Sequence, residues 1–272
     1  MANEFKGWAE DDARNFVAIP QETDDKYLRG VLGVITGSVE YPGSAVLGVD
    51  AALRTGVGML RYFGPEVATS MVLARRPEAV TVEGKVQAWL FGSGIPDTSK
   101  IESDSRGISI ALESGTPLVL DAGGLALVSK AVGPKVLTPH AGELSKLLGQ
   151  DLAEIKSNPQ FWVQRASETL SATVVLKGNS TWISGPGGNL VVKSPTTWLA
   201  TAGTGDSLAG ITGALLATHS REIESDERIL TALAATAVVI HGLAGVAANS
   251  AGPFTVLGLN ESIPSVIAKL IS

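Results

Sequence analysis

The chain contains no cysteine among its 272 residues. This absence excludes disulfide bonds, thiolate nucleophiles and thiolate metal ligands together. It agrees with a reducing compartment, and we expect a cytoplasmic location. The first twenty residues, "MANEFKGWAEDDARNFVAIP", also lack the apolar segment of a secretory signal peptide.

Basic residues are too few for a nucleic-acid-binding surface. Lysine and arginine number 21 against 27 aspartates and glutamates, so the net charge is −6. Charged residues make up 18% and hydrophobic residues 44%, a balance that excludes a disordered chain and supplies a sizeable core. We therefore expect a folded protein without a nucleic-acid partner.

Long apolar runs are scarce. The longest, "TALAATAVVIHGLAGVAA" (231–248), is rich in alanine and contains His241 and two glycines. This composition predicts a buried helix rather than a membrane span, with His241 in or near the core, and no membrane partner. No repeat or linker divides the chain, so residues 1–272 are expected to form a single domain. The polar residues 1–25 are expected to form an irregular arm.

Short apolar runs alternate with longer helical segments along the chain. This alternation predicts an α/β fold with a central, mostly parallel sheet and helices on both faces. The expected segments are strands within 31–37, 88–94, 116–124 and 172–179, a strand, turn and helix over 134–149, a hairpin over 181–195 with Gly187-Gly188 in its turn, and helices over 43–58, 106–115, 162–171, 206–218 and 227–248.

Glycine-containing turns follow five of the predicted strands: "TGS", "GSG", "DAGG", "TPHAGE" and "KGNST". One such turn alone is ordinary. Parallel strands bring their carboxyl ends to one edge of a sheet, however, and ligands bind in α/β proteins at that edge. The five turns together predict a binding site there.

The most informative stretch is "TAGTGD" (201–206), which precedes an apolar helix. Glycines leave backbone N–H groups free to surround an anion, and a helix N-terminus adds partial positive charge. Phosphate is the expected guest, and Asp206 would then lie where it can take a proton from a hydroxyl that attacks phosphorus. The alternative is that Asp206 only caps the helix.

Several common motifs are absent. The P-loop pattern G-x-x-x-x-G-K-[ST] is not found, and "GVITGSVEYPG" has the wrong spacing for a dinucleotide fingerprint. No spacing of histidines and acids indicates a zinc site, and no nucleophile elbow is present. A magnesium ion held mainly by phosphates and water would leave no trace in the sequence.

Three further polar residues follow predicted strands, and each has two interpretations. His140 is either a capping residue or a ligand-binding group. Lys177 is either an exposed residue at a strand end or part of the site. Asp121 is either a turn former or a ligand of a hydroxyl or a hydrated metal ion.

Taken together, these segments resemble the ADP/ATP-dependent NAD(P)H-hydrate dehydratases, which have a ribokinase-like fold. The resemblance runs from about residue 25 to 271 and has an actinobacterial character in "DKYLRGVLGV". "GTGD" is shared with other ribokinase-like kinases, whereas "TPHAGE" with "LKGNST" and the early "GSVEYPG" is more specific. These segments are "GVLGVITGSVEYPGSAVLGVDAALRTGVGMLRY", "GSG", "VLDAGGL", "LTPHAGELSKLL", "VVLKGNSTWI" and "ATAGTGDSLAGITGALLA".

The resemblance implies a repair reaction. Hydrated NADH or NADPH is phosphorylated on its ring hydroxyl by ADP, and loss of phosphate then restores NAD(P)H with AMP and phosphate as the other products. It implies magnesium as cofactor, ADP as co-substrate, a homo-oligomer (a tetramer) and a separate epimerase acting on the same substrate. The chain length is expected to leave no room for the epimerase domain that some relatives carry.

The resemblance also implies site residues. Asp206 would be the catalytic base, and the backbone groups of Gly203 and Gly205 would stabilise the transferring phosphoryl group. The residues implied to meet the hydrated dinucleotide are Ser44, Gly94, His140 and Asp206. The residues implied to bind the nucleotide are Lys177, Gly178, Asn179, Ser180, Thr181 and Gly205.

Four positions depart from the family's usual residues. Ser44 stands where alanine is usual, Gly124 and Ala126 lie in "DAGGLAL" where the family often has "DADALN", and Thr201 replaces a common asparagine. Two other functions stay open at this stage. One is a ribokinase-like kinase for a small alcohol, such as a vitamin precursor, and the other is a nucleotide-binding module without catalysis.

Overall fold

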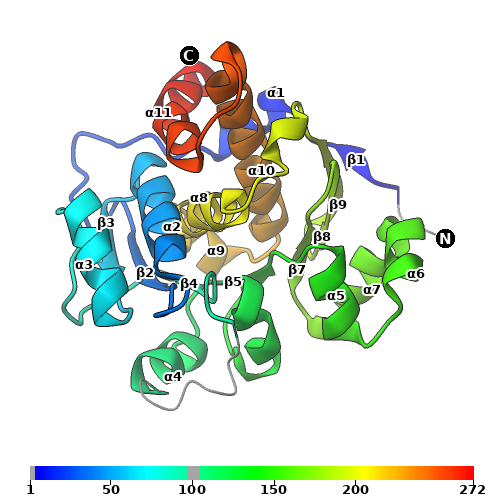
Figure 1. Ribbon diagram of the computed structural model, residues 1–272, viewed down its shortest axis with the longest axis horizontal. Coiled ribbons are helices and arrows are strands. Elements are labelled where there is room, and N and C mark those ends of the chain that lie inside the picture. Colours follow the sequence, from blue (N-terminus) through cyan, green and yellow to red (C-terminus); the bar gives the residue numbers. More distant parts are fainter. Residues whose placement is uncertain (1–3, 97–104) are drawn as a thin grey trace.

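The computed structural model describes residues 4–96 and 105–272 (Figure 1). Its nine-stranded sheet has the order β1-β9-β8-β7-β6-β5-β4-β2-β3. Neighbouring strands are parallel, except that β8 runs antiparallel to both β7 and β9. The predicted α/β fold with a mostly parallel sheet is thus confirmed. The strands are β1 (Lys6–Gly7), β2 (Val31–Ile35), β3 (Met59–Tyr62), β4 (Ala88–Phe91), β5 (Leu118–Leu120), β6 (Lys135–Leu137), β7 (Thr173–Leu176), β8 (Ser180–Gly185) and β9 (Gly188–Lys193).

Helices cover both faces of this sheet (Figure 1). One face carries α1, α2, α3, α8, α9, α10 and α11, and the other carries α4, α5, α6 and α7. The helices are α1 (Glu10–Ala13), α2 (Pro42–Arg54), α3 (Glu66–Arg75), α4 (Ser105–Glu113), α5 (Ala141–Leu148), α6 (Leu152–Ser157), α7 (Pro159–Leu170), α8 (Thr204–Thr218), α9 (Ser220–Ser225), α10 (Ile229–Ala248) and α11 (Val256–Ile271). Short 3₁₀ helices are η1 (Arg14–Phe16), η3 (Ala122–Lys130), η4 (Thr197–Leu199) and η5 (Asn249–Ala251).

The strands divide the interior into two hydrophobic cores. In β4, Ala88 and Leu90 point into the core under α2, α8 and α10, whereas Trp89 and Phe91 point into the core under α4 and α7. Successive side chains of a strand point to opposite faces, so a strand that is buried on both faces is apolar at every position. This is why the strands appear in the sequence as continuous apolar runs.

Helices α2 and α8 cross at close range, and this crossing positions residues of the candidate site. Gly48 of α2 faces Gly210 of α8, and a Cβ atom at Gly210 would overlap the carbonyl oxygen of Gly48. Residues four apart lie on the same face of a helix. Ser44 lies four residues before Gly48, and Asp206 lies four residues before Gly210. Each therefore lies on the face of its helix that contacts the other helix, one turn before the crossing.

Buried Asn260 of α11 joins the same two helices. Its Oδ1 atom accepts a hydrogen bond of 2.7 Å from Ser207 Oγ of α8, and its Nδ2 atom donates to the carbonyl of Leu47 of α2 at 3.0 Å. A satisfied buried amide fixes the relative position of the groups it bonds. The first turn of α8 is thereby held in register with α2.

The long apolar segment forms the core helix α10. By length and composition alone, residues 229–251 are long and apolar enough to cross a membrane, and the most apolar 18-residue window has a mean hydropathy of 2.0. In this fold, 78% of the most apolar window is buried inside the protein. The buried helix predicted there agrees with this placement.

Three features differ from the sequence-based expectations. The hairpin turn is Pro186-Gly187, because Gly188 already pairs with Gly185. The N-terminal segment is not irregular throughout, because β1 pairs with the edge strand β9. The helix expected to reach residue 58 ends at Arg54, where the left-handed Gly56 (φ +101°) turns the chain into β3.

The α2–α8 crossing gives a stability prediction. Replacing Gly210 by alanine should destabilise the protein by about 1–3 kcal/mol, because the new methyl group overlaps the backbone of Gly48. Gly107→Ala is the matched control: the added Cβ meets nothing within 4 Å in helix α4, and the gain in helix propensity should be neutral or stabilising by up to about 1 kcal/mol. Urea unfolding measures both changes, and equal stability of the two variants would contradict the close crossing.

Candidate active site

The site lies at the carboxyl ends of the parallel strands, where the strand order reverses. The chain passes from β2 to β3 on one side and then crosses back to β4 on the other side of β2. The loops after β2 and β4 meet there, with the amide of Gly37 donating to the carbonyl of Ser93 at 2.7 Å. Such a reversal is the usual place for ligands in open α/β sheets.

Helix α8 begins at this edge with unpaired backbone donors. Its N-cap is Gly203, whose φ of +94° is left-handed and favours glycine, and no side chain in residues 4–96 or 105–272 caps the helix. Within the described residues, the amides of Gly205 and Asp206 have no hydrogen-bond acceptor. The interpretation of Asp206 as a mere cap is therefore wrong, and these two donors form a cradle suited to an anion.

The carboxyl group of Asp206 is held away from water next to this cradle. Burial, followed by the nearby Asp121 carboxylate, raises its pKa from 3.8 to about 7. A hydrogen bond from Ser44 and the positive charge of Lys177 act in the opposite direction. A carboxylate with a pKa near neutrality is suited to accept a proton at physiological pH.

Lys177 supplies the positive charge of the site. Its Nζ atom lies 3.1 Å from Asp121 Oδ1 and 3.8 Å from Glu143 Oε2. Burial alone would lower the pKa of Lys177, but the charges of Asp121 and Glu143 outweigh it, so the pKa is raised. A Cβ atom at Gly205 would lie 3.5 Å from this ammonium, which places it beside the start of α8.

Asp121 fixes the ammonium through its side chain, and its carbonyl oxygen also accepts from the amide of Gly124 at 2.8 Å in the turn that follows β5. It follows β5 and is buried, with Oδ2 accepting from Ser93 Oγ at 2.8 Å and Oδ1 accepting from Thr138 Oγ1 at 2.7 Å and from Lys177 Nζ. Three donors from three neighbouring strand ends thus converge on one carboxylate. The sequence raised Asp121 only as an open alternative, and its position after an apolar strand was the available signal.

His140 caps helix α5, and its ring remains exposed. The ring Nδ1 atom accepts from the amides of Gly142 (3.0 Å) and Glu143 (3.2 Å), while the Glu143 carboxylate accepts from the backbone of His140 at 2.7 Å. The side chain is 60% exposed. The capping interpretation agrees with this geometry, and a contact with the dinucleotide stays a prediction.

Ser44 and Gly94 lie against each other beside Asp206. Gly94 has a left-handed φ of +70°, and a Cβ atom there would overlap the Cβ of Ser44. The Ser44 hydroxyl donates to the Asp206 carboxylate, as its effect on the pKa of Asp206 indicates. The two residues predicted to meet the substrate therefore adjoin the predicted base.

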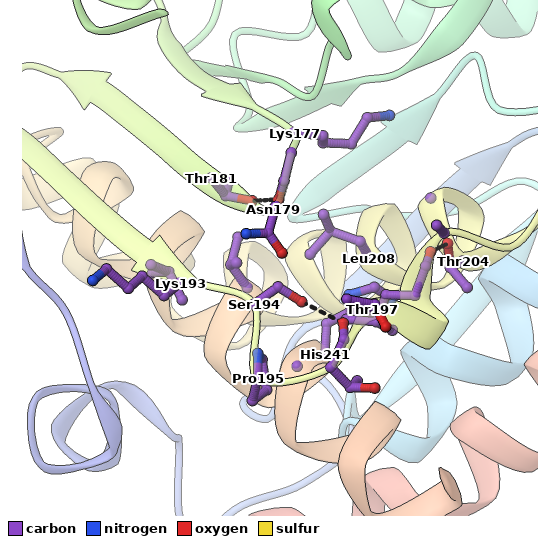
Figure 2. A pocket seen from close by; sticks show the side chains of 18 residues that line it. Lys177, Asn179, Thr181, Lys193, Ser194, Pro195, Thr197, Thr204, Leu208 and His241 are labelled. Atoms are coloured by element: carbon purple, nitrogen blue, oxygen red, sulfur yellow. Dashed lines mark hydrogen bonds between the residues drawn. The ribbon is translucent and has the colours of Figure 1, made fainter. Parts of the chain in front are cut away.

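A pocket of about 430 Å³ opens next to the start of α8 (Figure 2). Of the residues predicted to bind a nucleotide, all except Ser180 line it. The pocket also includes residues that the sequence did not indicate. The lining residues are Lys177, Gly178, Asn179, Thr181, Val192, Lys193, Ser194, Pro195, Thr196, Thr197, Leu199, Ala200, Thr204, Gly205, Leu208, Val238, His241 and Gly242.

The donor set suits a magnesium ion that is carried mainly by a ligand. Across the part of the chain that the structure describes, no three acidic or histidine side chains gather to hold a metal ion. Both oxygens of Asp121 are already engaged. The residues therefore fit an ion that would be held mainly by phosphate oxygens and water rather than by protein side chains.

Comparisons with known proteins agree with this geometry. A family model described as NAD(P)H-hydrate dehydratase matches residues 32–263. The bifunctional NAD(P)H-hydrate repair enzyme Nnr of Mycobacterium tuberculosis is 40% identical over 212 residues, which cover 73% of this chain and 43% of that protein. The chain thus spans less than half the length of that relative. The ADP-dependent (S)-NAD(P)H-hydrate dehydratase of Bacillus subtilis is 31% identical over 231 residues, 78% of this chain and 81% of that protein.

Solved structures agree with the fold. The crystal structure of ADP/ATP-dependent NAD(P)H-hydrate dehydratase from Bacillus subtilis, co-crystallised with ATP and Mg²⁺, superposes with a TM-score of 0.87 at 26% identity, covering 98% of this chain and 99% of that one. A ribokinase-like superfamily protein from Enterococcus faecalis superposes with a TM-score of 0.83 at 22% identity, covering 98% and 96%. The fold is therefore ribokinase-like, as expected.

The raised pKa of Asp206 predicts a stability change that depends on pH. The folded protein holds a proton on Asp206 up to about pH 7, whereas the unfolded chain loses it near 3.8. Ionisation of Asp206 therefore costs stability as pH rises between these values. Asp206→Asn should raise the melting temperature at pH 8 by roughly 5 °C, and this gain should shrink towards zero at pH 4.

Calorimetric unfolding of both proteins across this pH range measures the difference. Asp226→Asn, which changes an exposed carboxylate paired with Arg228, is the control and should show no gain at pH 8. A destabilised Asp206→Asn protein at pH 8 would show that the carboxylate is not desolvated.

Proposed function

The chain belongs to the NAD(P)H-hydrate dehydratase family, and we propose that it repairs hydrated NADH and NADPH by ADP-dependent phosphorylation and elimination. The family places the chain among enzymes named for this lyase reaction. The observation that carries the proposal is the position of Asp206, a desolvated carboxyl group directly beside two unpaired amides and a lysine-lined pocket. This arrangement joins a base to an anion cradle.

The first step is phosphoryl transfer. The hydroxyl oxygen of the hydrated nicotinamide ring bonds to the terminal phosphorus of ADP while Asp206 takes the hydroxyl proton. The bond between that phosphorus and the bridging oxygen breaks, and AMP leaves. The amides of Gly205 and Asp206, with Lys177, stabilise the charge on the transferring group.

The second step is elimination. The carbon–oxygen bond of the ring phosphate breaks, and phosphate leaves with the bonding electron pair. Loss of a proton from the adjacent ring carbon restores the double bond of the dihydronicotinamide. The net products are NAD(P)H, AMP and phosphate, so atoms and charges balance without a redox reagent.

Magnesium is part of the proposal. A magnesium ion bound to the nucleotide phosphates would neutralise charge that develops during transfer. In this chain, Asp121 and Glu143 would hold waters of that ion, and Lys177 lies between them. The Bacillus subtilis relative was co-crystallised with ATP and Mg²⁺, which supports a nucleotide and magnesium here.

The setting of the reaction follows from the same resemblance. We expect a cytoplasmic enzyme that forms a homo-oligomer, a tetramer in the family's usual form. A separate epimerase would convert the other epimer of the hydrate into the one repaired here.

A direct assay tests the function. The purified protein is mixed with hydrated NADH, magnesium and ADP, and the near-ultraviolet absorbance of the dihydronicotinamide is followed together with AMP and phosphate. We expect a return of absorbance that requires the nucleotide and stops when a chelator removes magnesium. A stable phosphate ester in place of free phosphate would instead identify a small-alcohol kinase, and bound ADP without turnover would identify a silent binding module.

Loss of the base should lower turnover far more than it affects nucleotide binding. Asp206→Asn keeps the size of the side chain but removes the proton acceptor, so kcat should fall by at least about 100-fold. The Kd for ADP should change by less than about threefold, since the amide cradle is backbone. Asp226→Asn serves again as the control and should keep normal turnover. Near-normal turnover of Asp206→Asn would show that Asp206 is not the catalytic base.

Ser44 should set the pH at which this base works. Turnover should rise with pH as Asp206 ionises, with a midpoint near its pKa of about 7. The hydrogen bond from Ser44 favours the ionised form, so Ser44→Ala should move the midpoint upward, by on the order of one pH unit. A pH profile of kcat measures this shift, and an unchanged or lowered midpoint would contradict the contact.

A further inference from the structure

A second cavity, of about 480 Å³, opens beside α5, a helix on the face of the sheet opposite α8 and α10 (Figure 1). It is bordered by the turn after β4, the 3₁₀ helix η3 and helix α5, and it shares no described residue with the pocket beside α8. Its size is typical of cavities that bind small molecules. No motif in the sequence indicated this space, which we call the α5 cavity.

The α5 cavity adjoins the residues predicted to carry the chemistry. Glu143 lines it, and the Oε2 atom of Glu143 lies 3.8 Å from Nζ of Lys177, which lines the pocket beside α8. Ile95 also lines it and directly follows Gly94, which lies against Ser44. The predicted position of the substrate ring therefore lies between the two cavities.

The turn after β5 forms one wall of the α5 cavity. Ala122 lines this wall with a left-handed φ of +45°, and a Cβ atom at Gly123 would overlap the carbonyl oxygen of Ile95. Residues that carry a Cβ rarely adopt this conformation, and backbone strain of this kind gathers at ligand sites. The close contact between the two turns fixes the wall on this side.

The cavity contains one positive charge that the protein does not compensate. Lys146 lines it three residues after Glu143, a spacing at which two side chains of a helix can pair. Glu143 instead accepts from the backbone amide of His140 at 2.7 Å and lies next to Lys177. Within residues 4–96 and 105–272, the Lys146 ammonium has no ion-pair partner. It is therefore available to an anionic ligand.

The other walls of the cavity are largely apolar. Pro96, Leu125 and Leu147 border it together with Ile95. Apolar walls with a few placed polar groups suit an aromatic base, and a lysine beside them suits a phosphate group. The proposed reaction requires room for such a ligand: with ADP in the pocket beside α8, the part of the dinucleotide beyond its ring and ribose must lie elsewhere.

We propose that the α5 cavity binds the adenosine half of the hydrated dinucleotide and that Lys146 pairs with a phosphate group of that half. This inference rests on the proposed function, which places the hydrated ring beside Asp206. The adenosine half carries one phosphate of the diphosphate bridge in both dinucleotides and a 2′-phosphate in NADPH alone. Binding energy from this remote half then favours the dinucleotide hydrates over a hydrated mononucleotide.

Kinetics with a truncated substrate test the proposal. Hydrated reduced nicotinamide mononucleotide has the ring and hydroxyl of the dinucleotide hydrates but lacks the adenosine half. With ADP and magnesium, the unmodified protein should use it with a kcat/KM at least about 10-fold lower than that for hydrated NADH or NADPH. Equal use of the three hydrates would overturn the proposal.

Filling the cavity should affect the dinucleotides alone. Ala126 is exposed and lines the cavity, so Ala126→Phe places a ring there without disturbing the core. The KM for both dinucleotide hydrates should rise by about 10-fold, whereas the KM for ADP and the kcat/KM for the mononucleotide hydrate should stay within about twofold. Ala153→Phe, at an exposed alanine of α6 outside the cavity, is the matched control and should change none of these values.

Removing the charge identifies the phosphate. Lys146→Met keeps the aliphatic part of the side chain and should raise the KM for hydrated NADPH by about fivefold, whereas Lys146→Arg should not. A rise for hydrated NADPH alone assigns Lys146 to the 2′-phosphate, and an equal rise for hydrated NADH assigns it to the bridge. Lys130→Met, at an exposed lysine of η3 outside the cavity, is the control. No rise with either dinucleotide, or an equal rise with the mononucleotide hydrate, would overturn the pairing.

The outcomes distinguish this inference from the proposed function. Unchanged KM values for the dinucleotide hydrates in Ala126→Phe, or an equal loss with the mononucleotide hydrate, would overturn the role of the cavity while leaving the repair reaction in place. Failure of the unmodified protein to turn over any hydrate would contradict the reaction instead. Calorimetric titration of NADPH and of reduced nicotinamide mononucleotide then still tests the cavity, which requires that Ala126→Phe weaken the binding of NADPH alone.

Discussion

The carboxyl group of Asp206 loses most of its contact with water where α2 packs against α8, and the other features of the site follow from this constraint. The crossing is close because Gly48 faces Gly210. It brings Ser44 to the carboxyl group, while buried Asn260 holds the register of the two helices. A buried charge is unfavourable in a resting protein, and its presence at an open strand edge is typical of a group kept for chemistry.

The positive charge of Lys177 lowers the pKa of Asp206, but by less than burial raises it. Lys177 interacts most closely with Asp121, at 3.1 Å, and acts on Asp206 only through its field. Asp121 in turn raises the pKa of Asp206 while it fixes Lys177. The lysine therefore remains beside the unpaired amide of Gly205, where a phosphoryl group would need it, and Asp206 keeps a pKa at which it can take up and release a proton.

The strand positions and the glycine turns were predictable, because a doubly buried strand is apolar at every residue and its following turn is rich in glycine. Asp206 was predictable for the same local reason, since "GTGD" directly precedes an apolar helix. Other features depend on contacts between distant segments. Strand β3 is only four residues long, α11 contains Pro264 within the helix, and the residues around Pro195 that border the pocket belong to no motif. His241 lies in an alanine-rich helix, and no local pattern shows that its ring reaches a cavity rather than the core.

The proposed mechanism requires that the ring hydroxyl itself receives the phosphoryl group before it leaves. Hydrated NADH prepared in ¹⁸O-water carries the label on that hydroxyl, and the reaction is then run with ADP and magnesium in ordinary water. Mass spectrometry of the inorganic phosphate reads the outcome. We expect one ¹⁸O atom in each phosphate released, because the carbon–oxygen bond breaks after transfer. Unlabelled phosphate, with the label in water, would show that ADP hydrolysis and dehydration are separate and would contradict the role given to Asp206.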